Sequence, residues 1–124
     1  MNEQLFYSSI IIGIIIALIS IKCYKCELLP LYIITYIGII TSMINHRITN
    51  DYAKWLDRFM MCITAIVYYH YVLQIKNENI KNISLCVIYL MILLYLSSKL
   101  FENTNIHLIT HVLSLLLFSL LTDC

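Results

Sequence analysis

Long uncharged hydrophobic runs alternate with short charged segments along the whole chain. Five runs lack Asp, Glu, Lys and Arg altogether, and they cover residues 5–21, 28–45, 59–75, 82–98 and 103–122. Each run is close to the roughly 20 residues that an α-helix needs to cross the hydrocarbon core of a bilayer. Open strand edges are too costly in lipid, so the pattern predicts helices at about 5–21, 28–46, 55–75, 82–98 and 104–122.

The segments between the runs are short and carry the charged residues. Tight connections of this kind make each helix antiparallel to the one before it. The first run is preceded by Asn2 and Glu3 and has no basic residue before it, so we expect a retained helix and not a cleaved signal. The predicted fold class is therefore all-α: a polytopic membrane bundle of five transmembrane helices forming a single integral membrane domain over residues 1–124.

Composition narrows the class of protein further. Hydrophobic residues make up 61% of the 124 residues and charged residues only 12%, so a soluble domain of this size is excluded. The net charge of +1 supplies no field for nucleic acid, which is excluded as a partner. The loop charges do not orient the bundle, because the two predicted faces carry four basic residues each. These are Arg47, Lys54, Arg58 and Lys99 on the N-terminal face, and Lys22, Lys25, Lys76 and Lys81 on the other.

Three of the four histidines fall near one predicted membrane surface. His46 ends the second run, and His107 and His111 begin the fifth, four residues apart and hence on one helical face. Helices that alternate in direction bring the end of the second and the start of the fifth to the same side. His70 lies about 20 Å further along its helix than Asp57, so we exclude it from this group.

Three imidazoles from two helices are the ligand set of a catalytic zinc ion, which leaves its fourth position to water. Two further residues are predicted to act in the same layer. Asp57, at the start of the third helix, is placed either to move a proton or to orient an imidazole. Ser42, one turn before His46, is placed to hold the water or the oxyanion. Each signal also has a simpler interpretation: interfacial histidines, a solvated Asp at a helix start, and a serine bonded to its own helix.

The spacing of these residues resembles that of the CREST superfamily of membrane hydrolases. The matching elements are Ser42-x-x-x-His46, Leu56-Asp57 at the start of the next helix, and His107-x-x-x-His111 in the last one. Residues 42–60 look most like the alkaline ceramidases. The resemblance implies that His46, His107 and His111 bind Zn²⁺ and that Ser42 and Asp57 are catalytic.

The resemblance also implies a shortened form of the family fold, with five helices in place of seven. The loss of an even number of helices keeps all five site residues on one face. The implied activity is hydrolysis of the amide bond of ceramide or another N-acyl lipid, in the endoplasmic reticulum or Golgi membrane. Five helices enclose less space than seven, so a homo-oligomer is one way to shelter a long acyl chain.

Two other functions stay open at this stage. The chain is alternatively a non-catalytic, zinc-stabilised protein of the receptor-like or hemolysin III-like kind, in which the metal only ties helices together. It is alternatively a small membrane scaffold without metal. The lipid hydrolase is the preferred hypothesis, since the five site residues share one predicted layer.

Overall fold

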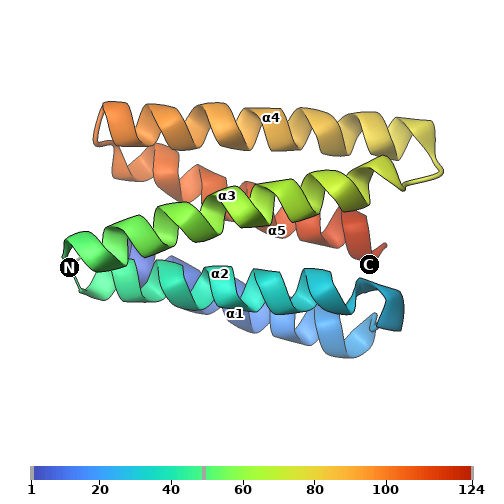
Figure 1. Cartoon of the computed structure of the whole chain (residues 1–124), viewed down its shortest axis with the longest axis horizontal. Coiled ribbons are helices and arrows are strands. Elements are labelled where there is room, and N and C mark those ends of the chain that lie inside the picture. The colour runs from blue at the N-terminus through green and yellow to red at the C-terminus, as the bar shows by residue number, and fades with distance from the viewer. Residues whose placement is uncertain (1, 49, 124) are drawn as a thin grey trace.

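The computed structural model of the chain describes residues 2–48 and 50–123 and is helical almost throughout. Within these residues there is no strand, which confirms the predicted all-α class. The helices are α1 (Glu3–Lys22), a short 3₁₀ helix η1 (Cys26–Leu28), α2 (Leu29–Arg47), α3 (Asp51–Leu73), α4 (Glu78–Leu100) and α5 (Thr104–Thr122). Figure 1 shows the five long helices side by side, with successive helices running in opposite directions.

The five long helices form a closed ring. Each helix packs against its neighbours in the chain, and α5 packs back against α1. In this ring α2 and α5 are not adjacent, because α1 lies between them. The N-termini of α1, α3 and α5 and the C-termini of α2 and α4 share one end of the bundle (Figure 1), which we call the N-terminal end.

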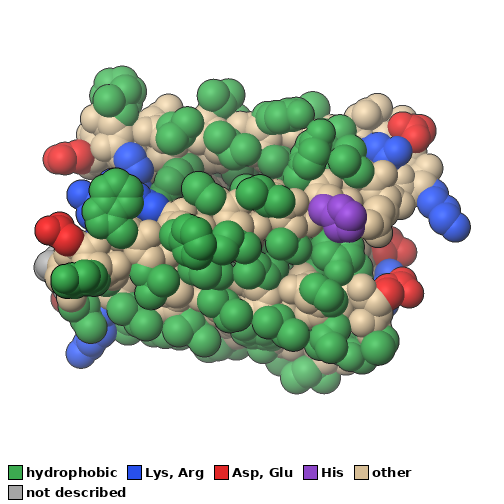
Figure 2. All heavy atoms as spheres, in the orientation of Figure 1, with side chains coloured by type: hydrophobic (Ala, Val, Ile, Leu, Met, Phe, Trp, Pro, Cys, Tyr) green, Lys and Arg blue, Asp and Glu red, His purple; other side chains and the backbone are tan. Residues whose placement is uncertain are grey.

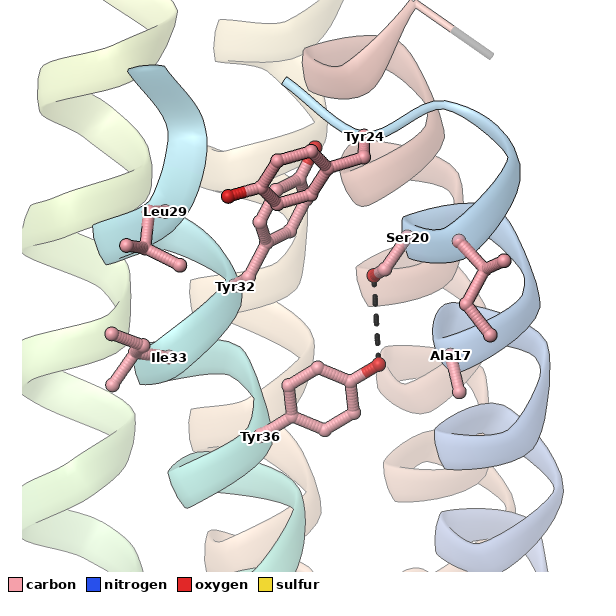
Figure 3. Close-up of a pocket in the computed structure, with 8 residues that line it drawn as sticks. Ala17, Ser20, Tyr24, Leu29, Tyr32, Ile33 and Tyr36 are labelled. Atoms are coloured by element: carbon pink, nitrogen blue, oxygen red, sulfur yellow. Dashed lines mark hydrogen bonds between the residues drawn. The ribbon is translucent and has the colours of Figure 1, made fainter. Parts of the chain in front are cut away.

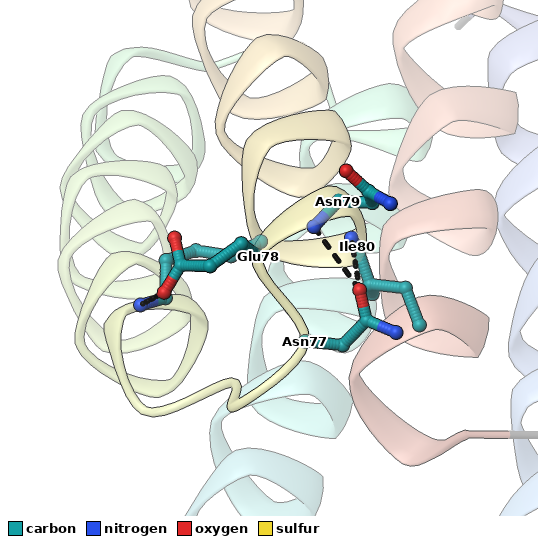
Figure 4. A network of polar contacts seen from close by, with 5 residues as sticks. Asn77, Glu78, Asn79 and Ile80 are labelled. Carbon is teal, nitrogen blue, oxygen red and sulfur yellow. Dashed lines mark hydrogen bonds and ion pairs between the residues drawn. The ribbon is translucent and has the colours of Figure 1, made fainter.

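Asparagine caps explain why several helices start earlier than their hydrophobic runs. The side chain of Asn77 accepts hydrogen bonds from the backbone N–H groups of Asn79 and Ile80, as Figure 4 shows. Asn2, Asn50 and Asn103 cap α1, α3 and α5 in the same way. A cap satisfies backbone donors that the helix leaves unpaired, so the first turn tolerates charged residues. As a result α3 begins at residue 51 where we expected 55, and α4 begins at 78 where we expected 82.

The surface of the bundle is that of a multi-pass membrane protein. Four helical segments in the described residues are long and apolar enough to cross a bilayer: Glu3–Lys22, Cys26–Arg47, Glu78–Leu100 and Thr104–Thr122. Large hydrophobic side chains are exposed on all five long helices, including Phe59 and Ile66 of α3. Figure 2 shows hydrophobic side chains along the middle of the molecule and charged ones at its two ends.

The helix α3 is the exception among the five predicted spans. It has 23 residues, which is long enough, but it is not among the four apolar segments. The reason lies in its sequence, since Asp57, Arg58 and His70 interrupt the hydrophobic stretch. Four spanning helices are therefore supported by length and composition, one fewer than we predicted.

The interior of the ring differs between its two ends. The buried hydrophobic cluster occupies the end away from the N-terminus, where Leu31, Val72 and Phe118 are completely buried. The interior of the N-terminal end instead contains buried polar side chains from all five long helices, among them Ser9, Ser42, His46, Asp57, Ser98 and His107. One half of the bundle is thus a packed apolar core, and the other half contains the candidate site.

Candidate metal centre

The three predicted histidine ligands meet inside the N-terminal end of the ring. Their ligand nitrogens all lie within 4.8 Å of one another. The ring centroids of His46 and His107 are 5.1 Å apart, those of His107 and His111 5.0 Å, and those of His46 and His111 5.7 Å. Because α2 and α5 are not neighbours in the ring, the imidazoles meet across its interior and not at a helix–helix seam.

A hydrogen bond to α1 determines which nitrogen of His111 is free. Ser8 Oγ lies 2.7 Å from His111 Nδ1, and its hydroxyl donates to the Leu5 carbonyl at 2.9 Å. With Nδ1 engaged by Ser8, Nε2 is the ring nitrogen of His111 that is left for another partner. Metal-binding histidines are commonly oriented in this way, by a hydrogen bond to the other ring nitrogen.

The imidazole of His46 presents an unused nitrogen to the interior. Its Nε2 is buried and has no hydrogen-bond partner among the described residues, and the residue is only 5% exposed. The backbone there is fixed by the chain start, because the N–H of Asn2 donates to the His46 carbonyl at 2.9 Å. The Asn2 side chain also donates to Thr104 Oγ1 at 3.2 Å, which ties the start of α1 to the start of α5. Buried polar atoms are normally satisfied, so a free Nε2 here calls for a ligand.

These donors fit a divalent metal ion. Imidazole nitrogens suit zinc, copper, iron and nickel, and a group of three leaves room for a further ligand. Two nitrogens bound tetrahedrally to zinc at about 2.0–2.1 Å lie about 3.3 Å apart. The 4.8 Å limit found here is wider than that spacing by about 1.5 Å, so the rings would have to move closer to hold the ion.

Asp57 lies at the same end of the bundle and is almost completely buried, at 2% exposure. Its Oδ2 accepts a hydrogen bond from Asn45 Nδ2 at 2.9 Å. Its Oδ1 has no hydrogen-bond partner among the described residues. Asn45 precedes His46 directly, so one turn of α2 supplies both a metal-ligand candidate and the amide that holds the carboxylate. Sequence reasoning did not assign a role to Asn45.

Ser42 is buried one turn below His46 and faces α1. Its Oγ lies 3.4 Å from the Oγ of Ser9, whose hydroxyl donates to the Leu5 carbonyl at 2.9 Å. Ser42 is therefore the donor in the long contact between the two serines. The structure thus places Ser42 beside the site but gives it a serine partner on α1, which the sequence did not predict.

Two residues of α4 extend the site towards the end of the bundle. The ring of Tyr95 packs edge-on against His107, with centroids 5.7 Å apart, and Lys99 Nζ lies 5.2 Å from the centre of the Tyr95 ring. The ammonium group of Lys99 interacts electrostatically with Asp57 and with all three imidazoles of the cluster. We counted Lys99 only as a loop charge, because nothing in its local sequence connects it with the histidines.

The remaining histidine and the two cavities lie elsewhere. His70 is exposed on α3, and its Nε2 is 2.8 Å from Gln74 Nε2. An open groove of about 510 Å³ lies between α1 and α2 at the opposite end, where Tyr36 donates to Ser20, as Figure 3 shows. A smaller cavity lies between the start of α4 and the end of α5. Neither cavity includes a residue of the histidine cluster.

The chain was compared with known protein families, curated proteins and solved structures. No family model, no curated protein and no solved structure matches the chain.

Proposed function

We propose that this protein is a zinc-dependent membrane hydrolase that cleaves the amide bond of a lipid, as the resemblance to alkaline ceramidases implies. The observation that carries the proposal is the meeting of His46, His107 and His111 inside an otherwise membrane-adapted bundle. Ionisable groups are costly in such an interior, so a cluster of them argues for function. By the same resemblance we assign the protein to the endoplasmic reticulum or Golgi membrane and ceramide or another N-acyl lipid as the substrate.

The proposal includes five membrane spans, with α3 as the fifth. The helix packs against α2 and, more sparsely, against α4, and its 23 residues correspond to about 35 Å. Its least apolar part, around Asp57 and Arg58, lies in the second turn, near the surface of the bilayer. Asp57 faces the interior of the ring, where a polar group of a membrane helix is best tolerated.

When bound by the three imidazoles, zinc supplies a Lewis acid that polarises the amide carbonyl and makes water a better nucleophile. The chain itself supplies the proton transfer and the positioning. Asp57 accepts a proton at its free Oδ1 and returns it to the departing amine, while Asn45 holds Oδ2 fixed. The Ser42 hydroxyl, one turn deeper, is available to hold the oxygen of the reacting group.

Metal analysis and hydrolysis of ceramide by the detergent-solubilised protein test this function together. We expect about one zinc ion per chain and release of fatty acid. His46→Ala is expected to lose both, whereas Asp57→Asn is expected to keep the zinc and lose the hydrolysis. His70→Ala is the matched control and should change neither. A wild-type protein without zinc, or a His46→Ala variant that keeps it, would contradict the proposal.

A second function is favoured by the position of the cluster in the ring. Because α2 and α5 are not neighbours in the ring, a metal ion held by His46 and the two α5 histidines would act as a clamp across the bundle. A purely structural zinc site predicts that chelation lowers the unfolding temperature. It also predicts that Asp57→Asn leaves every activity unchanged, which separates it from the hydrolase.

A further inference from the structure

A group of basic residues lies at the N-terminal end of the bundle, beside the metal centre. Lys54 and Arg58 are four residues apart in the first turns of α3, so they extend from one side of that helix. Both interact electrostatically with Lys99 at the end of α4. Figure 2 shows basic side chains gathered at this end, over the start of α3 and the end of α4. We call Lys54, Arg58 and Lys99 the basic cluster.

The basic cluster has no ion pair with a neighbouring acid among the described residues. None of its members forms a salt bridge among the described residues, where Lys81 with Glu78 at the opposite end is the ion pair present. The buried carboxylate of Asp57 interacts with Arg58 and Lys99, whereas Asp51 and Glu102, which are also at this end, form no salt bridge with the cluster. Lys99 is itself half-buried, and like charges held close together raise the free energy unless an anion joins them.

Two aromatic rings connect the cluster with the membrane surface and with the histidines. The guanidinium carbon of Arg58 lies 5.2 Å from the centre of the Trp55 ring, and Trp55 is exposed. Lys99 lies at 5.2 Å over Tyr95, which contacts His107 in turn. Exposed tryptophans and lysines at helix ends mark the level of lipid head groups. The basic cluster thus lies at head-group depth, one aromatic ring away from the metal centre.

The helices that carry the cluster are less tightly packed here than elsewhere in the ring. Of the neighbouring pairs of long helices, α3 and α4 have the sparsest contacts. They approach each other at the end where they are connected and diverge towards the N-terminal end (Figure 1). The basic cluster therefore lies at the end where the backbones of α3 and α4 diverge.

We propose that the basic cluster binds the anionic head group of a lipid, a phosphate or a carboxylate, and that the substrate of the hydrolase is therefore an anionic N-acyl lipid. This second part rests on the proposed function. Arg58 suits such a group because guanidinium binds two oxygens of one phosphate or carboxylate, and the two lysines add point charges. Asp57, which interacts with Arg58 and Lys99, has its Oδ1 unpaired among the described residues.

Binding is tested first, without any catalytic readout. Trp55 is the one tryptophan of the chain and lies against Arg58, so quenching of its fluorescence by brominated lipids reports occupancy of the cluster. We expect brominated phosphatidic acid to quench at lower mole fraction than brominated phosphatidylcholine. Lys99→Gln and Arg58→Gln should each reduce this preference about fivefold, since one basic residue near a lipid surface contributes about 1 kcal/mol.

A matched control variant distinguishes binding at the basic cluster from a general effect of the protein's net charge. Lys76→Gln lowers the net charge equally but lies at the opposite end, so it should leave the preference unchanged. Inorganic phosphate at millimolar concentration should not displace the anionic lipid, because the proposed ligand is the head group of a lipid. Equal quenching by both lipids in the wild type, or a preference that Lys76→Gln reduces as much as Lys99→Gln, would overturn the assignment. So would displacement by free phosphate.

Measurements of hydrolysis then test the head-group site and the proposed hydrolase activity independently of each other. An N-acyl lipid with a phosphate on its head group should be cleaved faster than the neutral lipid of the same chain length, and Lys99→Gln should remove this difference. Cleavage of both at equal rates would keep the hydrolase and overturn the anionic substrate. A clear binding preference without cleavage of any N-acyl lipid would keep the head-group site and overturn the hydrolase.

Discussion

At the scale of single residues, Ser8 holds the ring of His111, a candidate metal ligand. Its hydroxyl group forms a 2.7 Å hydrogen bond with Nδ1 of His111, which leaves Nε2 for another partner. Removal of such a partner commonly weakens metal binding by about 10–100-fold. We therefore expect Ser8→Ala to raise the dissociation constant for zinc within that range, measured by competition with a chromophoric chelator.

Ser20 provides the control for Ser8 because it lies on the same helix and bonds to its own backbone in a similar way. Its hydroxyl donates to the Ile16 carbonyl at 2.7 Å, far from the histidines. Ser20→Ala should leave zinc affinity unchanged. If Ser8→Ala binds zinc as tightly as the wild type does, the hydrogen bond does not orient the ligand.

Asn45 supports the buried carboxylate of Asp57 through its one hydrogen bond. With Asn45→Ala both oxygens of Asp57 would be buried and unpaired. Leaving a buried acceptor unsatisfied costs about 1–3 kcal/mol and more for a charged group. We expect the free energy of unfolding in mixed micelles to fall by at least that amount. Asn79→Ala, an exposed asparagine on α4, should change it by less than about 0.5 kcal/mol.

At the scale of helices, the sequence correctly predicted the features that depend on local periodicity, namely the long helices and the residues that share a helical face. The uncharged runs located all five long helices, and the four-residue spacing of His107 and His111 placed both on one face. The alternation of helix direction brought His46 to the same end. The positions of Ser8, Asn45 and Lys99 relative to the histidines could not be predicted, since they depend on how α1, α2, α4 and α5 rotate and pack. Contacts between residues about 100 positions apart leave no periodic signal in a single sequence.

A close approach of α2 and α3 gives a prediction at the same scale. Gly38 faces α3 so closely that an added Cβ would lie 3.3 Å from Thr64 Oγ1. Small residues allow membrane helices to approach in this way. Gly38→Leu should therefore separate the two helices and lower the free energy of unfolding by about 1–3 kcal/mol. Ile40→Leu, on a lipid-facing position of α2, should have little effect; equal stability of both variants would exclude the close packing.

At the scale of the whole molecule, the two halves of the ring have separate tasks. The half with Leu31, Val72 and Phe118 buries apolar side chains completely and provides rigidity. The half with the histidines contains unpaired buried atoms, namely His46 Nε2 and Asp57 Oδ1, which weaken packing unless a ligand satisfies them. In a bundle divided in this way, the apolar half maintains the fold, while the polar half has buried atoms that are available to bind a ligand.

The span of α3 decides how the whole molecule is placed in the bilayer. If α3 crosses, residues 50 and 77 lie on opposite sides of the membrane, and so do the two chain ends. If α3 lies along one surface, four spans bring both ends to the same side. Asn50→Cys and Asn77→Cys, each in a background with the native cysteines replaced by serine, are tested in sealed vesicles with a membrane-impermeant maleimide.

We expect the reagent added outside to label one of the two variants and to label the other only after the vesicles are opened. The physical reason is that α3 packs closely against α2, and that its buried Asp57 would lose its partner Asn45 if the helix swung out to the surface. Labelling of both variants from the same side would contradict this placement. It would also remove Asp57 from the layer of the histidines, and with it the proton transfer that we propose for the amide hydrolysis.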